Sequence, residues 1–221
     1  MKLFVQGMIK YISGVVLLGL LLFVPAGTLA WKQGWMLMGV LFIPMFLAGL
    51  VMMKKSPELL RKRLNMREQE TEQKEVIALS GILFAAVFIV AGLNYRFGWL
   101  VLSETVSWLA VILFLTAYAL YAEVLRENEY LSRTVEVQEG QKVIDTGLYG
   151  VVRHPMYMTT LFLFLSMPLI LGSLPSFVLM LGYIPIIAKR IRNEEKVLAE
   201  GLEGYADYQK RVKYKVIPYI W

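Results

Sequence analysis

Two polar groups flank one apolar hairpin, and their side chains are those best suited to chemistry. The first contains the chain's single histidine, His154, in an Arg-His-Pro-Met-Tyr sequence that ends at Tyr157. The second follows the next apolar stretch, where Arg190 precedes the acidic pair Glu194 and Glu195. A charge at the end of an apolar helix is costly and usually has a task. Together the two groups can hold a zwitterion beside an apolar groove.

Each of these residues also has an ordinary structural explanation. His154 precedes a proline, which favours extended backbone, so it can simply cap the helix that follows. Arg190 and Glu194 are four residues apart, so they can form a helical ion pair worth a few tenths of a kcal/mol. Glu195 points to an adjacent face, however, and the two acids cannot both pair with Arg190. The cluster as a whole therefore favours a binding site.

Hydropathy gives the fold class. Of 221 residues, 57% are apolar and only 18% are charged. Six apolar stretches lie at about 11–31, 34–53, 76–95, 105–125, 156–172 and 175–189. The first four approach the ~20 residues of a membrane-crossing helix. The last two are shorter and meet at a Gly-Ser-Leu-Pro turn. The pattern predicts an all-α integral membrane protein with four spanning helices and a C-terminal helical hairpin, which makes five to six membrane segments.

The first stretch resembles a secretory signal peptide, but it is too long for one and a second span follows directly. The chain has no cysteine, which excludes disulfides and thiolate metal ligands, and one histidine excludes a histidine-rich metal site. We therefore expect no metal.

Basic residues predict the orientation. Of the 23 lysines and arginines, 21 lie at the N-terminus, in the loops 54–75 and 126–155, or in the tail from Lys189. The alternate loops hold only Lys32 and Arg96. The positive-inside rule then places both termini, both long loops and the polar clusters in the cytoplasm. Because topology explains the net charge of +6, we expect membrane lipids as partners and no nucleic acid.

The segments between the apolar stretches also carry structural signals. Ser-Pro-Glu from Ser56 predicts the start of a charged surface helix. In loop 126–155, Glu139-Gly140 is flanked by Val135 and Val137 on one side and by Val143 and Ile144 on the other. This pattern favours an extended strap or short hairpin that can line a polar cavity. Apolar residues from Leu198 onward predict a C-terminal helix broken by glycines. We divide the chain into N-terminal transmembrane helices, 1–125, and a catalytic region, 126–221.

The C-terminal region resembles a known family. Residues 147–157 read Gly-Leu-Tyr-Gly-Val-Val-Arg-His-Pro-Met-Tyr, and residues 190–195 read Arg-Ile-Arg-Asn-Glu-Glu. Residues 205–212 read Tyr-Ala-Asp-Tyr-Gln-Lys-Arg-Val, with Pro218 beyond. These motifs and their spacing resemble the isoprenylcysteine carboxyl methyltransferase family of integral membrane enzymes. The resemblance covers residues 126–221, while residues 1–125 match only as hydrophobic helices.

The resemblance implies S-adenosylmethionine as the methyl donor. It places cofactor contacts in a cytoplasmic loop and at the start and end of the hairpin: Gln138, Gln141, Val143, Ile144, Gly147, Tyr149, His154, Pro155, Tyr157 and Glu194. Gln141 stands where eukaryotic members often have histidine. The resemblance also implies that Arg190 binds the acceptor carboxylate, with Glu195 as its acidic partner.

This chemistry suits the available residues. The methyl group of a sulfonium is already activated, so the protein must align donor and acceptor and exclude water. A carboxylate acceptor needs only a cation such as Arg190, whereas an amine would need a base such as Glu195 or His154. We expect an amphiphilic acceptor, either a small isoprenoid- or lipid-like molecule or a lipidated one.

Two other functions fit the same sequence. Membrane sterol or enone reductases that use NADPH can carry a similar Arg-His-x-x-Tyr element, although the acidic pair at 194–195 and the lack of a clear site for the extra ribose phosphate argue against one here. A helical scaffold or transporter would bind no such cofactor, and it would favour a charge in mid-membrane, which the sequence does not show.

Overall fold

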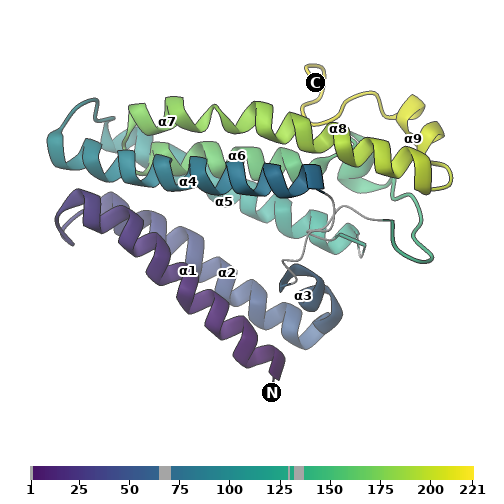
Figure 1. The fold of residues 1–221 in the computed structure, drawn as a ribbon, viewed down its shortest axis with the longest axis horizontal. Coiled ribbons are helices and arrows are strands. Elements are labelled where there is room, and N and C mark those ends of the chain that lie inside the picture. Colours follow the sequence, from purple (N-terminus) through teal and green to yellow (C-terminus); the bar gives the residue numbers. More distant parts are fainter. Residues whose placement is uncertain (1, 65–70, 129, 132–136) are drawn as a thin grey trace.

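The long apolar runs form a helical bundle (Figure 1). The structure is a computed structural model that describes residues 2–64, 71–128, 130–131 and 137–221. The N-terminal region contains α1 (Lys2–Ala26), α2 (Lys32–Lys55), α3 (Pro57–Leu64), α4 (Thr71–Phe97) and α5 (Glu104–Glu127). The C-terminal region contains the 3-10 helix η1 (Gly147–Gly150), α6 (Pro155–Ile170), α7 (Leu174–Met180), α8 (Tyr183–Gly201) and α9 (Tyr205–Arg211).

The described residues confirm the all-α fold class. Five helical segments are long and apolar enough to cross a membrane: α1, α2, α4, α5, and α7 with α8 as one segment of 28 residues. The sixth, α6, is apolar but has only 16 residues. The first helix spans Lys2–Ala26 rather than the predicted 11–31. It ends there because Gly27 adopts left-handed backbone, with φ of 71°, and stops the helix.

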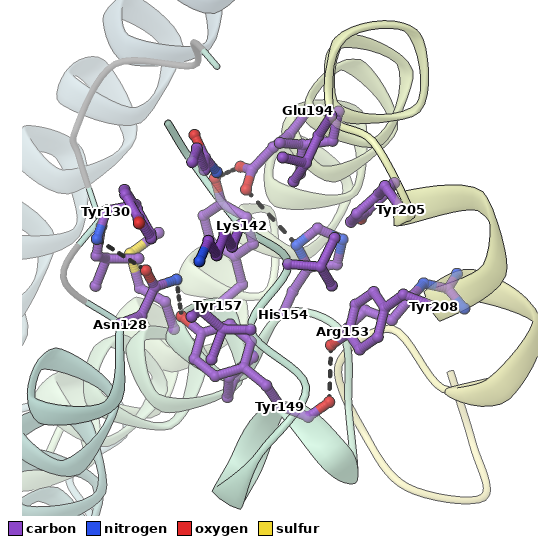
Figure 2. A pocket seen from close by; sticks show the side chains of 18 of the residues that line it. Asn128, Tyr130, Lys142, Tyr149, Arg153, His154, Tyr157, Glu194, Tyr205 and Tyr208 are labelled. Atoms are coloured by element: carbon purple, nitrogen blue, oxygen red, sulfur yellow. Dashed lines mark hydrogen bonds and ion pairs between the residues drawn. The ribbon is translucent and has the colours of Figure 1, made fainter. Parts of the chain in front are cut away.

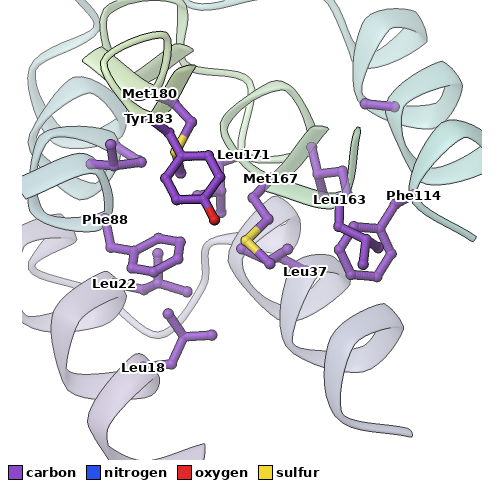
Figure 3. Close-up of a cluster of buried hydrophobic side chains, with 14 of the residues drawn as sticks. Leu18, Leu22, Leu37, Phe88, Phe114, Leu163, Met167, Leu171, Met180 and Tyr183 are labelled. Atoms are coloured by element: carbon purple, nitrogen blue, oxygen red, sulfur yellow. The ribbon is translucent and has the colours of Figure 1, made fainter. Parts of the chain in front are cut away.

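A shared apolar core holds the helices together. The buried cluster in Figure 3 joins Leu22 of α1 and Phe88 of α4 to Met167 of α6 and Met180 of α7. Helices α1 and α4 approach so closely at Gly92 that a Cβ there would lie 2.6 Å from the carbonyl oxygen of Leu22. Large apolar side chains on the outer faces remain exposed, as expected for surfaces that contact lipid.

The far end of the α6–α7 hairpin is fixed by backbone hydrogen bonds to the α4–α5 connection. Leu102 donates to the carbonyl of Gly172 at 2.9 Å, and Leu174 donates to that of Leu100 at 3.2 Å. Buried Asn94 of α4 supports this connection by accepting from the Leu100 amide at 2.9 Å. The two hairpin helices are therefore held in register with α4 and α5.

The other end of the bundle carries the irregular segments. The predicted surface helix after Ser56 is α3, while residues 65–70 of that loop lie outside the described residues. In the strap, Gln141 donates its amide to the carbonyl of Gln138 at 3.0 Å, which forms the expected turn around Glu-Gly. Val135 lies outside the described residues. The predicted break in the tail is present, because α8 ends at Gly201 and α9 begins after Gly204, whose φ is 81°.

Candidate active site

His154 lies at the junction of three segments. It is the residue before α6, with φ of −125°, and its side chain makes no capping hydrogen bond to that helix. Its amide donates to the carbonyl of Lys215 at 2.8 Å, and the amide of Arg153 donates to that of Tyr214 at 2.9 Å. The imidazole is only 4% exposed and lies between the two acids of α8. The capping explanation is therefore wrong for the ring.

Glu195 is the centre of a buried ion-pair network. Its Oε1 accepts from Arg153 Nε at 2.8 Å and lies 3.3 Å from His154 Nε2. Its Oε2 accepts from Lys215 Nζ at 2.6 Å. The resemblance paired Glu195 with Arg190, and the structure corrects that assignment. Glu195 is five positions after Arg190, so the helix turns its carboxylate toward the tail instead.

A second network joins Glu194, Tyr157 and Arg190. Arg190 donates from Nε to the Tyr157 hydroxyl at 3.0 Å, and that hydroxyl donates to Glu194 Oε2. Arg190 and Glu194 are thus linked through Tyr157, on the same face of α8 as their spacing predicts. The other oxygen of Glu194 lies 3.8 Å from His154 Nδ1. The two networks therefore meet at the histidine ring.

These side chains line a cavity of about 100 Å³ (Figure 2). The cavity lies where the strap, the start of α6, the end of α8 and α9 converge. Nine of the predicted site residues line it: Gln141, Val143, Ile144, Tyr149, His154, Pro155, Tyr157, Arg190 and Glu194. The remaining three, Gln138, Gly147 and Glu195, are not among the lining residues.

Gln138 and Gly147 support the cavity wall from outside it. Gln138 Nε2 donates to the carbonyl of Tyr130 at 2.6 Å, and its amide donates to Gln141 Oε1 at 2.9 Å. Gly147 has left-handed backbone, with φ of 52°, and a Cβ there would lie 3.0 Å from the Glu127 carboxylate. Only glycine fits this turn without strain.

Helix α9 covers one side of the cavity. Tyr208 donates its hydroxyl to the carbonyl of Tyr149 at 2.7 Å, which ties α9 to η1. Leu202, Tyr205 and Tyr208 pack with Val143 of the strap in a small apolar cluster. The tail motif contained both tyrosines, and the sequence predicted Tyr205 only as an apolar position of a tail helix packed over the cytoplasmic mouth. The helical spacing of apolar residues after Leu198 was the signal for this packing.

Sequence reasoning missed other lining residues. They come from the end of α5, the strap, the first turn of α6 and the tail: Asn128, Tyr130, Leu131, Lys142, Arg153, Met156, Leu198, Leu202, Tyr205 and Tyr208. Asn128 Nδ2 donates to the Tyr149 hydroxyl at 3.0 Å, a contact between residues 21 positions apart. No local sequence pattern predicts a contact between residues this far apart in the chain.

Tyr205 has a buried hydroxyl that has no hydrogen-bond partner among the described residues. Burial raises the pKa of this phenol, and the neighbouring carboxylates of Glu195 and Glu194 raise that pKa further. The hydroxyl therefore keeps its proton at neutral pH and remains a donor. A buried donor without a partner costs about 1–3 kcal/mol, which a ligand can recover.

The lining fits an amino-acid-bearing nucleoside such as S-adenosylmethionine. The Glu194 carboxylate suits a cationic group, the Tyr205 phenol offers a donor, and Tyr149 presents an aromatic ring. Apolar Val143 and Ile144 suit the less polar part of such a ligand. Among the described residues, no group of three or more acidic or histidine side chains could hold a metal ion.

Comparison with known proteins gives similarities to membrane methyltransferases. A model of the phospholipid methyltransferase family matches residues 105–203, the segment that contains most of the cavity wall. A solved structure of the eukaryotic intramembrane Ras methyltransferase, an isoprenylcysteine carboxyl methyltransferase, has the same fold with a TM-score of 0.60. It is 18% identical, and the match covers 92% of this chain and 74% of that one.

A third similarity is to Delta(14)-sterol reductase from Mus musculus, which is 30% identical over 91 residues. That match covers 40% of this chain but spans only 22% of the reductase. The family match and the fold support the class predicted from the sequence. This chain is a multi-pass integral membrane protein with a fold like that of isoprenylcysteine carboxyl methyltransferase, and its residues 105–203 match the phospholipid methyltransferase family model.

Proposed function

We propose that this chain transfers a methyl group from S-adenosylmethionine to the carboxylate of an amphiphilic, isoprenoid- or lipid-like acceptor. One observation carries the proposal: Glu194, Tyr157 and Arg190 form a single hydrogen-bonded chain along the cavity wall. The chain presents an acidic group at one end and a guanidinium at the other. It can thus hold a cationic donor and an anionic acceptor side by side.

Each residue has a part in this arrangement. Glu194 and His154 hold the cofactor at its charged end, and Tyr149 and the strap hold its nucleoside. S-adenosylmethionine supplies an already activated methyl group when bound. Arg190 orients the acceptor carboxylate, and its Nε–H bond to Tyr157 fixes the plane of the guanidinium. Exclusion of water by α9 strengthens both electrostatic contacts.

Binding and turnover of the purified full chain test the proposal. We expect S-adenosylmethionine to bind in lipid nanodiscs with a micromolar dissociation constant, or about 7–8 kcal/mol. His154→Ala and Tyr149→Ala should each weaken binding by about 1–3 kcal/mol through lost buried contacts. Transfer of labelled methyl groups to a membrane lipid extract, with products identified by mass, should reveal the acceptor. Unchanged affinity in both variants would remove these residues from the cofactor site.

The match to a sterol reductase supports a second candidate, NADPH-dependent reduction of a sterol or enone. The acidic wall around Glu194 disfavours the phosphates of NADPH, so we rank this function below methyl transfer. Calorimetry with S-adenosylmethionine and NADPH on the same preparation separates the two. Binding of NADPH without binding of S-adenosylmethionine would establish the reductase and reject the methyltransferase.

A further inference from the structure

Glu195 is buried and charged, yet it does not line the cavity. Its carboxylate faces three donors, on Arg153, Lys215 and His154. Two of them, Arg153 and Lys215, are cations that balance its charge and fix its position. Two of these residues, Arg153 and His154, line the cavity, so Glu195 can act on a ligand through either of them. Of the two, His154 is the one whose ring also faces Glu194.

The contact with Glu195 fixes the hydrogen positions on the imidazole. A carboxylate only accepts hydrogen bonds, so Nε2 of His154, at 3.3 Å, must carry a hydrogen. The other ring nitrogen, Nδ1, makes no hydrogen bond among the described residues, since the Glu194 oxygen facing it lies 3.8 Å away. The geometry therefore assigns the ring hydrogen to Nε2 and leaves a lone pair on Nδ1.

The lone pair on Nδ1 faces another acceptor. Glu194 Oε1 lies 3.8 Å from Nδ1, which is beyond the ordinary range for an N–H···O hydrogen bond. Two acceptors thus lie close together on the cavity wall, where Figure 2 joins them by a dashed line. A ligand group with several N–H donors and a positive charge complements this pair, and an ammonium group meets both requirements.

We propose that Glu195 is a positioning residue that holds the imidazole of His154 with its hydrogen on Nε2. Nδ1 of His154 and the carboxylate of Glu194 then together bind the ammonium group of an amino-acid-bearing ligand. The inference rests on the proposed function, because the α-ammonium of S-adenosylmethionine is the group that would occupy this place. Glu195 then positions a residue that binds the methyl donor, whereas the family resemblance had placed it beside Arg190 at the acceptor.

The chain's single histidine allows a direct test. Protein labelled with ¹⁵N-histidine in nanodiscs gives signals from one imidazole only. We expect a slowly exchanging Nε2–H and an unprotonated Nδ1 in the wild type. In Glu195→Gln, three donors face one oxygen, so the slow Nε2–H signal should disappear. Glu200→Gln, the same change at an exposed position of α8, should leave it intact. A ring in the wild type that is doubly protonated or protonated at Nδ1 overturns the proposal.

Ligand binding provides the second readout. S-adenosylhomocysteine carries the amino-acid group, whereas 5′-methylthioadenosine lacks it. We expect Glu195→Gln to weaken the former about tenfold, a loss expected for one charge-assisted hydrogen bond, and to leave the latter unchanged. In a His154→Ala background, Glu195→Gln should have no further effect, because the two residues act as one unit.

The outcomes separate this inference from the function on which it rests. If the wild type binds neither S-adenosylmethionine nor S-adenosylhomocysteine, the proposed function fails. If the wild type binds them and Glu195→Gln leaves the affinity for S-adenosylhomocysteine unchanged, Glu195 does not act through the ring. The same conclusion follows if Glu195→Gln weakens binding as much in a His154→Ala background as in the wild type. Glu195→Ala serves in the same cycle where Glu195→Gln does not fold, and it is read in the same way.

Discussion

Replacement of Arg190 distinguishes a role in catalysis from a role in packing. Its guanidinium donates to the Tyr157 hydroxyl at 3.0 Å, while that hydroxyl also bonds to Glu194. Arg190→Ala removes this hydrogen bond from a charged donor, and such a bond is worth about 1.5–3 kcal/mol. If the cation also aligns the acceptor, its loss misplaces the reacting carboxylate. Misplacement of this kind costs about 100-fold in turnover, or about 2.7 kcal/mol.

The assay is methyl transfer per folded molecule, with cofactor affinity measured on the same samples. We expect a fall of about 100-fold for Arg190→Ala with cofactor binding largely preserved. Arg190→Lys should not rescue turnover, because an ammonium lacks the planar fork that grips a carboxylate. Arg192→Ala, at an exposed position of the same helix, is the matched control. Turnover by Arg190→Ala within about twofold of wild type would refute the acceptor role, and lower thermal stability alone would indicate packing.

Three further predictions address the cofactor site, the core and the topology. Tyr205→Phe removes the buried unpaired hydroxyl, so it should weaken S-adenosylmethionine by about 1 kcal/mol in calorimetry while the melting temperature stays level or rises. Gly92→Ala places a Cβ 2.6 Å from the carbonyl of Leu22, so thermal unfolding should show a loss of about 1–3 kcal/mol; an unchanged melting temperature would contradict the close approach. Single cysteines at Gln33 and Gln209 should label from opposite sides of the membrane, with Gln209 reached only from the cytoplasm; labelling of both from one side would reject the orientation.

Hydropathy and turn signals were sufficient to predict most of the fold. Segments of about 20 apolar residues have one stable form in lipid, because a helix satisfies its own backbone hydrogen bonds. The N-terminal boundary of the first helix was placed too late, since its early turns carry polar residues among the apolar ones. The glycines at 201 and 204 marked the break in the tail correctly, because each interrupts a regular apolar spacing.

The sequence predicted which residues lie at the site better than it predicted the contacts between them. Spacing on α8 correctly placed Arg190 and Glu194 on one face, since positions four apart share a face. It could not show that Tyr157 would lie between them, because that contact depends on how α6 packs against α8. The partners of Glu195 come from residues 153 and 215, far apart in sequence, and only the folded tail brings them together.

The tail contributes to the site beyond the segment that matches the family model. The phospholipid methyltransferase match ends at residue 203, whereas Tyr205, Tyr208 and Lys215 lie beyond it. These residues close the cavity, supply its unpaired donor and complete the ion pairs of Glu195. The matched segment therefore provides the cationic and acidic groups, and the tail determines how they are held. Because the ammonium site we propose depends on Lys215 through Glu195, we expect Lys215→Ala to weaken the binding of an amino-acid-bearing cofactor although Lys215 lies outside the family match.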